Sequence, residues 1–275
     1  MTELDGLLAR WRRDLEAWAI PADIRAAATE DPWVLPRPVF ARRADRVSSE
    51  PSGPSYERAW AALEPPGAVL DVGAGAGAAC LPLLPRTAGL TAVDSDQGML
   101  ELLAERAAAH GVTARTVCGT WPEVAGQVPA ADVVTCHHVL YNVPGLAPFV
   151  TTLTARARRL VVAETTAEHP LVMLNDLWLR FHGLRRPQAP TADDLLRILT
   201  VMGLQPGHQR WHRPPAADYE SFEELAEITR RRLCLPPERA GEVAEALAGA
   251  GPQSALGQAS AGREVVTIWW RGTAS

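Results

Sequence analysis

The sequence has few of the features that mark several large classes of protein. Its four cysteines form no Cys-x-x-Cys pair, and three of them fall in apolar patterns typical of buried reduced thiols, so we expect no metal site. No run of about 18 apolar residues occurs, so we expect no membrane-spanning helix. The first 18 residues carry acids and no apolar run, unlike a signal peptide, which predicts a cytoplasmic protein.

The sequence also has no excess of positive charge. The net charge is −5, which argues against a broad nucleic-acid-binding surface, and we expect no nucleic-acid partner. Two short basic runs stand out, "RARR" at 156–159 and "RRR" at 230–232. For both we favour a solvated helix end or face over a phosphate-binding site.

The N-terminal segment differs from the rest of the chain. Apolar residues from Leu4 to Trp18 repeat at three- and four-residue steps, which predicts a helix ending before Pro21. Residues 29–55 carry five prolines, which predicts extended chain. The aromatic residues in it suggest that it packs onto something. We therefore expect residues 1–55 to form a docked, helical N-terminal cap, followed by a domain over 56–275.

After residue 55, short apolar strands alternate with helical patterns. Strands are predicted at 67–73, 90–94, 113–121, 131–140, 159–166 and 263–272, and helices after Asp96, at 147–157 and at 191–203. This alternation predicts an α/β fold: a doubly wound, mostly parallel, seven-stranded Rossmann-like sheet, with the N-terminal cap and helical insertions at 167–190 and 214–262.

A glycine-rich turn follows the first strand. In "AVLDVGAGAGAACLPLL" (68–84), Gly73, Gly75 and Gly77 come directly after it, at the edge where such folds bind ligands. Asp94 ends the second strand and could accept both hydroxyls of a ribose. Asp71 lies two residues before the first glycine, where it would repel a pyrophosphate but attract the cationic S-adenosylmethionine. The turn therefore favours the sulfonium cofactor over NAD.

These motifs resemble a known family. "VLDVGAGAG", "AVDSDQGML" and "ADVVTCHHVLYNV" are similar to those of small-molecule class I S-adenosylmethionine-dependent methyltransferases. The likeness covers residues 66–166, and the strand at 263–272 would be the family's reversed last strand. The resemblance implies a cofactor site made of Asp71, Gly73, Ala74, Gly75, Asp94, Ser95, Thr120, Trp121 and His137. In it Asp71 and the glycines would surround the methionyl part, Asp94 the ribose, and Trp121 would stack on or shield the adenine.

Candidate catalytic groups lie at the exits of the fourth and fifth strands. An oxygen acceptor must lose a proton, and His138, His137, Tyr141 and Glu164 are placed to take part. Adjacent histidines in a strand face opposite ways, so at most one should face the cofactor. His138 is our candidate base, with a purely structural strand-capping role as the alternative.

The acceptor stays open at this stage. The turn after the fourth strand lacks the "NPPY"-like signature of family members that methylate nucleobase amines or the glutamine amide. We expect O-, N- or C-methylation of a small, partly apolar molecule by a monomer or homodimer. The alternatives are a non-catalytic S-adenosylmethionine-binding regulator and, less favoured, an NAD(P)-dependent oxidoreductase.

Overall fold

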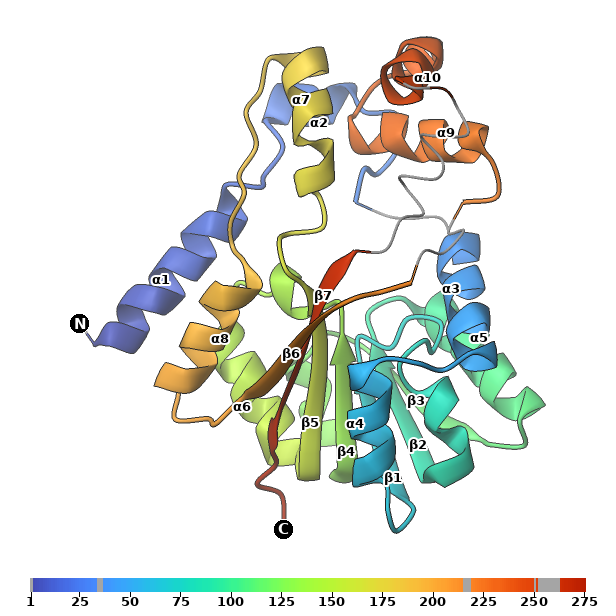
Figure 1. The fold of residues 1–275 in the computed structure, drawn as a ribbon, viewed down its shortest axis with the longest axis vertical. Helices are drawn as coiled ribbons and strands as arrows, with labels where there is room; N and C mark the ends of the chain where they lie inside the picture. Colours follow the sequence, from blue (N-terminus) through green and yellow to red (C-terminus); the bar gives the residue numbers. More distant parts are fainter. Residues whose placement is uncertain (1, 34–36, 215–218, 250, 252–262) are drawn as a thin grey trace.

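A seven-stranded sheet forms the centre of the molecule, in a computed structural model that describes residues 2–33, 37–214, 219–249, 251 and 263–275 (Figure 1). The strand order is β3-β2-β1-β4-β5-β7-β6. The strands are β1 Gly67–Val72, β2 Thr87–Asp94, β3 Ala114–Cys118, β4 Ala131–His137, β5 Ala157–Thr166, β6 Gly207–His212 and β7 Glu264–Arg271. Neighbours from β3 to β5 pair in parallel, and β7 is antiparallel to both β5 and β6, which confirms the doubly wound fold with a reversed last strand.

Helices surround this sheet. They are α1 Glu3–Glu16, α2 Ala22–Ala27, α3 Arg37–Ser49, α4 Pro54–Ala62, α5 Gln97–Ala109, α6 Leu146–Arg156, α7 Asn175–His182, α8 Ala192–Val201, α9 Phe222–Arg232 and α10 Ala240–Ala248. Short 3₁₀ helices are η1 Leu81–Arg86, η2 Glu123–Gln127, η3 Leu140–Asn142, η4 Val172–Leu174 and η5 Pro237–Arg239. Over the described ranges, no helix has the length and apolar character needed to cross a membrane.

Two apolar clusters cover the two faces of the sheet. On one face α1, α6 and α8 pack through residues such as Trp11, Phe149 and Ile198. On the other, α4, η1 and α5 pack through residues such as Leu63 and Leu103. The predicted start signals hold at two helices: Thr191 and Asp194 form a reciprocal capping box on α8, and Asp96 caps α5. The sheet is therefore buried on both sides, and its carboxyl edge is left to build a site.

The chain after the glycine-rich turn forms no α-helix. The segment that contains Pro82 and Pro85 is the 3₁₀ helix η1. The cause is the proline pair, because proline has no N–H to donate to the preceding turn and its ring crowds the carbonyl there. The glycine-rich turn is thus not followed by the N-terminus of an α-helix.

The prediction of extended chain over residues 29–55 is wrong for much of that segment, because α3 spans Arg37–Ser49. Pro38 lies in its first turn, where a missing N–H costs nothing, and no further proline follows until Pro51. Phe40 and Ala44 of α3 pack near the glycine-rich turn and α5. This helix, which we did not predict because of the number of prolines, therefore covers the glycine-rich turn.

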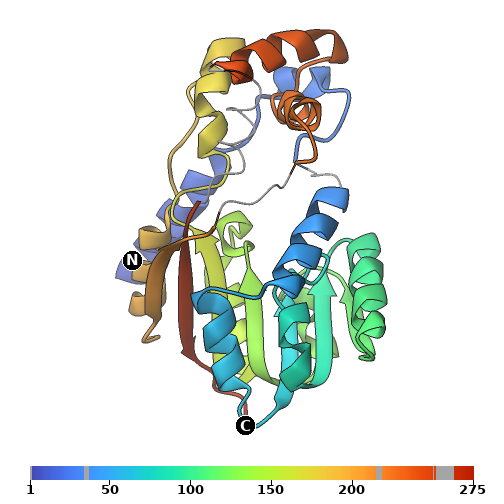
Figure 2. The same cartoon turned by 45° about the vertical axis from the view of Figure 1, so that its right-hand side comes forward.

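Helices from distant parts of the sequence gather beyond the carboxyl edge of the sheet (Figure 2). There α7 and the segment after α9 share an apolar cluster with α2 and α10, centred on Trp178 and Leu233. Residues 1–55 are spread over this cluster, the sheet face beside α8 and the surface of α5. The predicted insertion 167–190 contributes η4 and α7, and 214–262 contributes α9 and α10, although 215–218, 250 and 252–262 lie outside the described residues.

Candidate active site

The predicted site residues meet at the carboxyl ends of neighbouring strands. Because β1 lies between β2 and β4, and β4 pairs with β5, the ends of all four strands form one edge. Register places His137 of β4 opposite Glu164 of β5. The glycine-rich turn after β1, Asp94 of β2 and the two histidines therefore share this edge.

The glycine-rich turn needs its glycines for conformation and for space. Gly73 has a φ of +72°, and Gly75 and Gly77 also have positive φ, a region that side chains disfavour. A Cβ on Gly73 would collide with the side chain of Val139. The backbone N–H of Gly73 donates to the carbonyl of Val93 over 2.8 Å, which ties the turn to the end of β2.

Asp71 is a fully buried carboxylate beneath this turn. Oδ1 accepts a 2.8 Å hydrogen bond from the Thr135 hydroxyl, whereas Oδ2 has no hydrogen-bond partner among the described residues. Burial raises the pKa of Asp71 to about 6, although the hydrogen bond from Thr135 opposes this shift. A buried carboxylate with an unsatisfied oxygen is stabilised by a nearby cation.

Asp94 holds the glycine-rich turn as well as ending its strand. Its Oδ2 accepts from the Gly75 N–H at 2.8 Å, and its Oδ1 accepts from the Asp96 N–H at 2.9 Å. Each carboxylate oxygen has a second lone pair, and Asp94 is partly exposed, so it keeps the capacity to accept from a diol.

The residues expected near the adenine differ in exposure. Ser95 and Thr120 are exposed at the same edge. Trp121 is only 6% exposed and packs in the core, where its indole N–H donates to the Phe149 carbonyl over 3.3 Å. The core covers most of the Trp121 ring. That Trp121 stacks on or shields the adenine stays a prediction.

The two histidines take different conformations. His137 ends β4, and burial lowers its pKa to about 4. Its Nε2 is buried and has no hydrogen-bond partner within the described part of the chain. His138 has a φ of +60°, an uncommon value for a residue other than glycine, and its N–H donates to the Glu164 carbonyl over 2.7 Å. This turn brings the His138 ring back to the Glu164 side chain.

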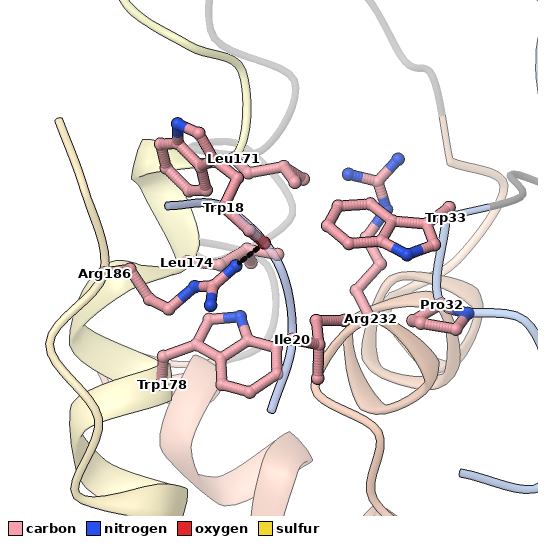
Figure 3. Close-up of a pocket in the computed structure, with 9 residues that line it drawn as sticks. All are labelled: Trp18, Ile20, Pro32, Trp33, Leu171, Leu174, Trp178, Arg186 and Arg232. Carbon is pink, nitrogen blue, oxygen red and sulfur yellow. Dashed lines mark hydrogen bonds between the residues drawn. The ribbon is translucent and has the colours of Figure 1, made fainter. Parts of the chain in front are cut away.

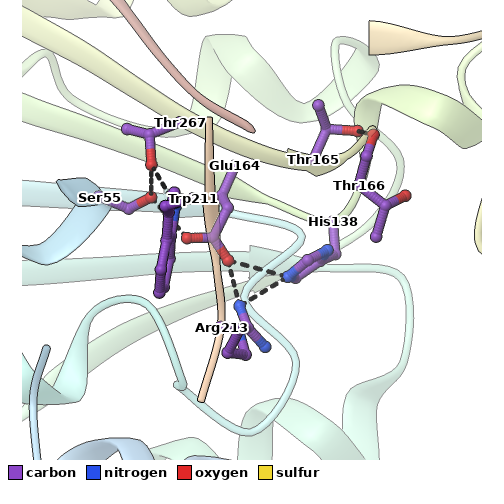
Figure 4. Close-up of polar contacts among 8 residues, drawn as sticks. All are labelled: Ser55, His138, Glu164, Thr165, Thr166, Trp211, Arg213 and Thr267. Atoms are coloured by element: carbon purple, nitrogen blue, oxygen red, sulfur yellow. Dashed lines mark hydrogen bonds and ion pairs between the residues drawn. The ribbon is translucent and has the colours of Figure 1, made fainter. Parts of the chain in front are cut away.

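Glu164 is the centre of a buried polar cluster (Figure 4). Its side chain is 3% exposed, with Oε1 3.0 Å from His138 Nε2 and also in contact with Arg213 Nη2. Its Oε2 accepts from the Ser55 hydroxyl at 2.5 Å. Burial alone would raise the pKa of Glu164, but the His138 hydrogen bond and the Arg213 charge hold it well below its ordinary value. Glu164 is therefore an anion at neutral pH.

The His138 ring has one engaged and one open nitrogen. Nε2 lies near both Glu164 and Arg213, whereas Nδ1 has no hydrogen-bond partner in the described ranges, and the side chain is 31% exposed. Burial lowers the pKa of His138 below 6.5, against the opposing effect of Glu164. The ring is therefore neutral at pH 7 and can accept a proton at one nitrogen.

Tyr141 lies beside His138, with 6.3 Å between the ring centroids. Burial raises the pKa of Tyr141 to about 12, although the positive charges of Arg43 and Arg232 oppose the shift. Its phenol is thus protonated at neutral pH. This makes Tyr141 a hydrogen-bond donor and not a base.

Sequence reasoning missed the remaining members of the Glu164 cluster. Ser55 is separated from Glu164 by 109 residues and Arg213 by 49, so no local motif joins them. The Ser55 and Thr267 hydroxyls lie 2.6 Å apart, and Trp211 donates to Thr267. Only the strand order, which brings β7 beside β5, could have pointed to Thr267.

Comparison with known proteins agrees with this geometry. Residues 69–161, from β1 to β5, match the family model described as "Methyltransferase domain". This match supports the resemblance to the class I S-adenosylmethionine-dependent methyltransferases over residues 69–161. No curated protein sequence matches it.

Solved structures share the fold of this methyltransferase at low identity. A cyclopropane-fatty-acyl-phospholipid synthase-like protein from Lactobacillus casei is 15% identical in sequence, with a TM-score of 0.53 and coverage of 96% of this chain and 99% of its own. The YcgJ protein of Bacillus subtilis is 18% identical, with a TM-score of 0.51 and coverage of 80% and 99%. Magnesium protoporphyrin IX methyltransferase from Synechocystis, solved with S-adenosylhomocysteine, is 16% identical, with a TM-score of 0.51 and coverage of 86% and 84%.

Proposed function

We propose that this methyltransferase transfers the methyl group of S-adenosylmethionine to a small-molecule acceptor, with His138 as the general base. The observation that carries the proposal is the pairing of His138 with the buried anion Glu164 at the strand edge beside the glycine-rich turn. Nothing else at this edge combines a proton-accepting nitrogen, partial exposure and a fixed carboxylate partner in the described ranges.

The residues at the edge fit the cofactor chemically. S-adenosylmethionine supplies an electrophilic methyl group on a positively charged sulfur. Asp71 contributes a buried negative charge with an unsatisfied oxygen, which favours the ammonium and sulfonium charges over a pyrophosphate. Asp94 would accept the ribose hydroxyls, with Gly73, Ala74 and Gly75 close to the methionyl part and Ser95 and Thr120 toward the adenosine. The binding of S-adenosylhomocysteine by the Synechocystis relative supports this assignment.

The role of His138 depends on which ring nitrogen carries the proton. We assign the proton to Nε2, which donates to Glu164, so that Nδ1 is the free acceptor. Glu164 then fixes the ring orientation and stabilises the imidazolium that forms when an acceptor hydroxyl gives up its proton. His137 and Tyr141 would orient the reactants, since His137 is buried and Tyr141 stays protonated.

The test begins with ligand binding. We expect calorimetric binding of S-adenosylhomocysteine and none of NAD or NADP. A panel of hydroxylated small molecules is then screened with an assay for S-adenosylhomocysteine release. His138→Gln keeps an amide where Nε2 meets Glu164 but removes Nδ1, so it should keep cofactor affinity within about threefold and lose roughly 10²–10⁴ in turnover.

The matched control is His208→Gln, which changes an exposed histidine of β6. It should leave both cofactor affinity and turnover unchanged. Wild-type turnover by the His138 variant would remove the base from the mechanism and leave positioning of the acceptor as the source of catalysis. Tighter binding of a dinucleotide than of S-adenosylhomocysteine would refute the cofactor assignment.

A further inference from the structure

A pocket lined by three tryptophans, four other apolar residues and two arginines lies in the cap beyond the carboxyl edge of the sheet (Figure 3). We call it the tryptophan pocket. Its lining residues are Trp18, Ile20, Pro32, Trp33, Leu171, Leu174, Trp178, Arg186 and Arg232. Three indole rings and several aliphatic side chains make its wall apolar, and Trp33 is 46% exposed. Such a wall suits a flat, apolar molecule.

The two arginines in this wall differ in their hydrogen-bond partners. Arg186 is satisfied, because its guanidinium donates to the carbonyls of Ala19 and Trp18. It also lies over the ring of Trp178, 4.9 Å from the centroid. Arg232 has no hydrogen bond or ion pair with any described residue, and Figure 3 shows its guanidinium directed away from Arg186. A half-buried guanidinium without an anion is costly unless a ligand supplies one.

The neighbours of Arg232 in the basic run 230–232 show that this state is specific to it. Arg230 is buried and pairs with Glu30 and Glu227, and Arg231 also pairs with Glu30. The expectation of a solvated helix end is therefore wrong for Arg230, which locks α9 to the chain after α2. Arg232 is the member of the run that faces the pocket.

A continuous row of rings connects the pocket to the proposed reaction centre. Trp18 stacks on His169 with 4.1 Å between centroids, and His169 meets the edge of Tyr141 at 5.7 Å. Tyr141 in turn lies beside His138. The charge of Arg232 acts on both His169 and Tyr141, so this guanidinium lines the pocket and lies near both rings.

Arg263 adds positive charge to the same region. Arg263, directly before β7, has an effect on Tyr141 like that of Arg232. Its guanidinium lies 3.0 Å from the sulfur of Met173, and no described carboxylate pairs with it. The carboxylate of Glu164 is already engaged by Arg213 and His138. Among the described residues, this region therefore carries more positive than negative charge.

From these observations we infer that the tryptophan pocket binds the methyl acceptor, and that the acceptor is a flat apolar molecule with an anionic group that pairs with Arg232. The inference rests on the proposed function, which it extends by naming the substrate class. A carboxylate and a phosphate ester share the required chemistry, because both accept two parallel hydrogen bonds from a guanidinium. The apolar body lies against the exposed ring of Trp33, and the anionic group lies toward Tyr141 and His138.

The test uses the full chain and a matched set of probes. Calorimetry measures the binding of 2-naphthoate, of its neutral analogue 2-naphthamide and of 2-naphthyl phosphate, each with and without S-adenosylhomocysteine. We expect at least one anion to bind tenfold or more tightly than the amide, and the comparison of the two anions identifies the preferred group. Arg232→Gln should weaken binding of that anion by about 10- to 150-fold and abolish the preference over the amide.

Two variants serve as controls. Arg185→Gln removes the same charge from an exposed residue of the neighbouring segment that does not line the pocket, and it should bind the anion within about threefold of wild type. Arg232→Lys keeps the charge but not the two parallel donors, so its affinity should lie between those of wild type and Arg232→Gln. Circular dichroism and melting temperature establish that each variant is folded.

The outcomes separate this inference from the proposed function. Equal affinity for the amide and the anions, no binding of any probe, or an unchanged affinity in Arg232→Gln overturns the inference while S-adenosylhomocysteine binding is retained. If the anion binds but S-adenosylhomocysteine does not, the proposed function fails and the acceptor role of the pocket fails with it. Binding of both ligands to the same molecule, with loss of only the anion in Arg232→Gln, supports the inference.

Discussion

Replacing Glu164 by glutamine should strongly destabilise the fold. The carboxylate is 3% exposed and receives hydrogen bonds from His138, Arg213 and Ser55. An amide of the same shape has one oxygen in place of two and turns an N–H₂ group toward one of these donors. Breaking a buried ion pair costs about 3–5 kcal/mol. Because the Arg213 side chain is 33% exposed and water can solvate part of it, we expect a loss of about 2–4 kcal/mol.

This loss can be measured by denaturant unfolding and by the melting temperature. A change of 1 kcal/mol shifts the melting temperature of a domain of this size by roughly 2–4 °C, so the variant should melt about 5–15 °C below wild type. The matched control is Asp132→Asn, at the opposite end of β4. That carboxylate accepts from the Ala68 N–H at 2.8 Å and pairs with Arg159, so its loss costs stability without touching the site.

The pH dependence gives an independent check on Glu164. Its pKa is held below the ordinary value of 4.5, so its contribution to stability is fully present above that value and is lost as the pH falls toward the lower folded-state pKa. The stability difference between wild type and Glu164→Gln should thus be constant above about pH 5 and narrow below about pH 4.5. A difference under about 0.5 kcal/mol at pH 7, or parallel pH profiles down to pH 3, would refute the assignment of Glu164 as a buried anion.

Two further predictions concern the cofactor. The affinity for S-adenosylmethionine should be constant above about pH 6 and fall below it, because protonation of Asp71, whose pKa is about 6, competes with the bound cation. Calorimetry from pH 5 to pH 8 should show this fall in affinity. In Asp71→Asn the affinity should no longer depend on pH over this range. Asp94→Asn should weaken S-adenosylhomocysteine binding by roughly 10- to 150-fold, the range for a charged hydrogen bond, with the melting temperature reporting any separate effect on the hydrogen bond to Gly75. A change below about threefold in calorimetry would show that Asp94 does not hold the ribose.

The parts of the fold that sequence predicts are those with local signals. The strands β1 and β4 are apolar runs, and the caps of α5 and α8 lie within a few residues of the helices that they start. The edge strand β6 was missed because "GHQRWH" is largely exposed and shows no apolar alternation. The helix α3 was missed because proline composition was weighed without regard to position, although Pro38 lies where a helix tolerates proline.

The same distinction between local and long-range contacts applies to the candidate site. The turn at Gly73 and the strand-end carboxylates were predictable, since one short segment sets their geometry. The partners of Glu164 were not, because Ser55 and Arg213 reach it only through the packing of α4 and of the chain after β6. The positive φ of His138 was equally hidden, and it is this turn that lets both adjacent histidines lie near the edge rather than one on each face of the sheet.

The similarity to other proteins covers only part of the candidate site. The family match ends at residue 161, three residues before Glu164, and Arg213 and Arg232 lie well beyond it. The matched part builds the glycine-rich turn and the strand ends, which serve any acceptor. Glu164, which fixes the histidine, lies near the end of β5 and beyond the match, and the residues that line the tryptophan pocket come from the cap and from segments after β5, where the shared fold imposes no chemistry. The choice of acceptor therefore depends on this chain's own side chains, and among these the guanidinium of Arg232, which pairs with no described residue, sets the most specific chemical requirement.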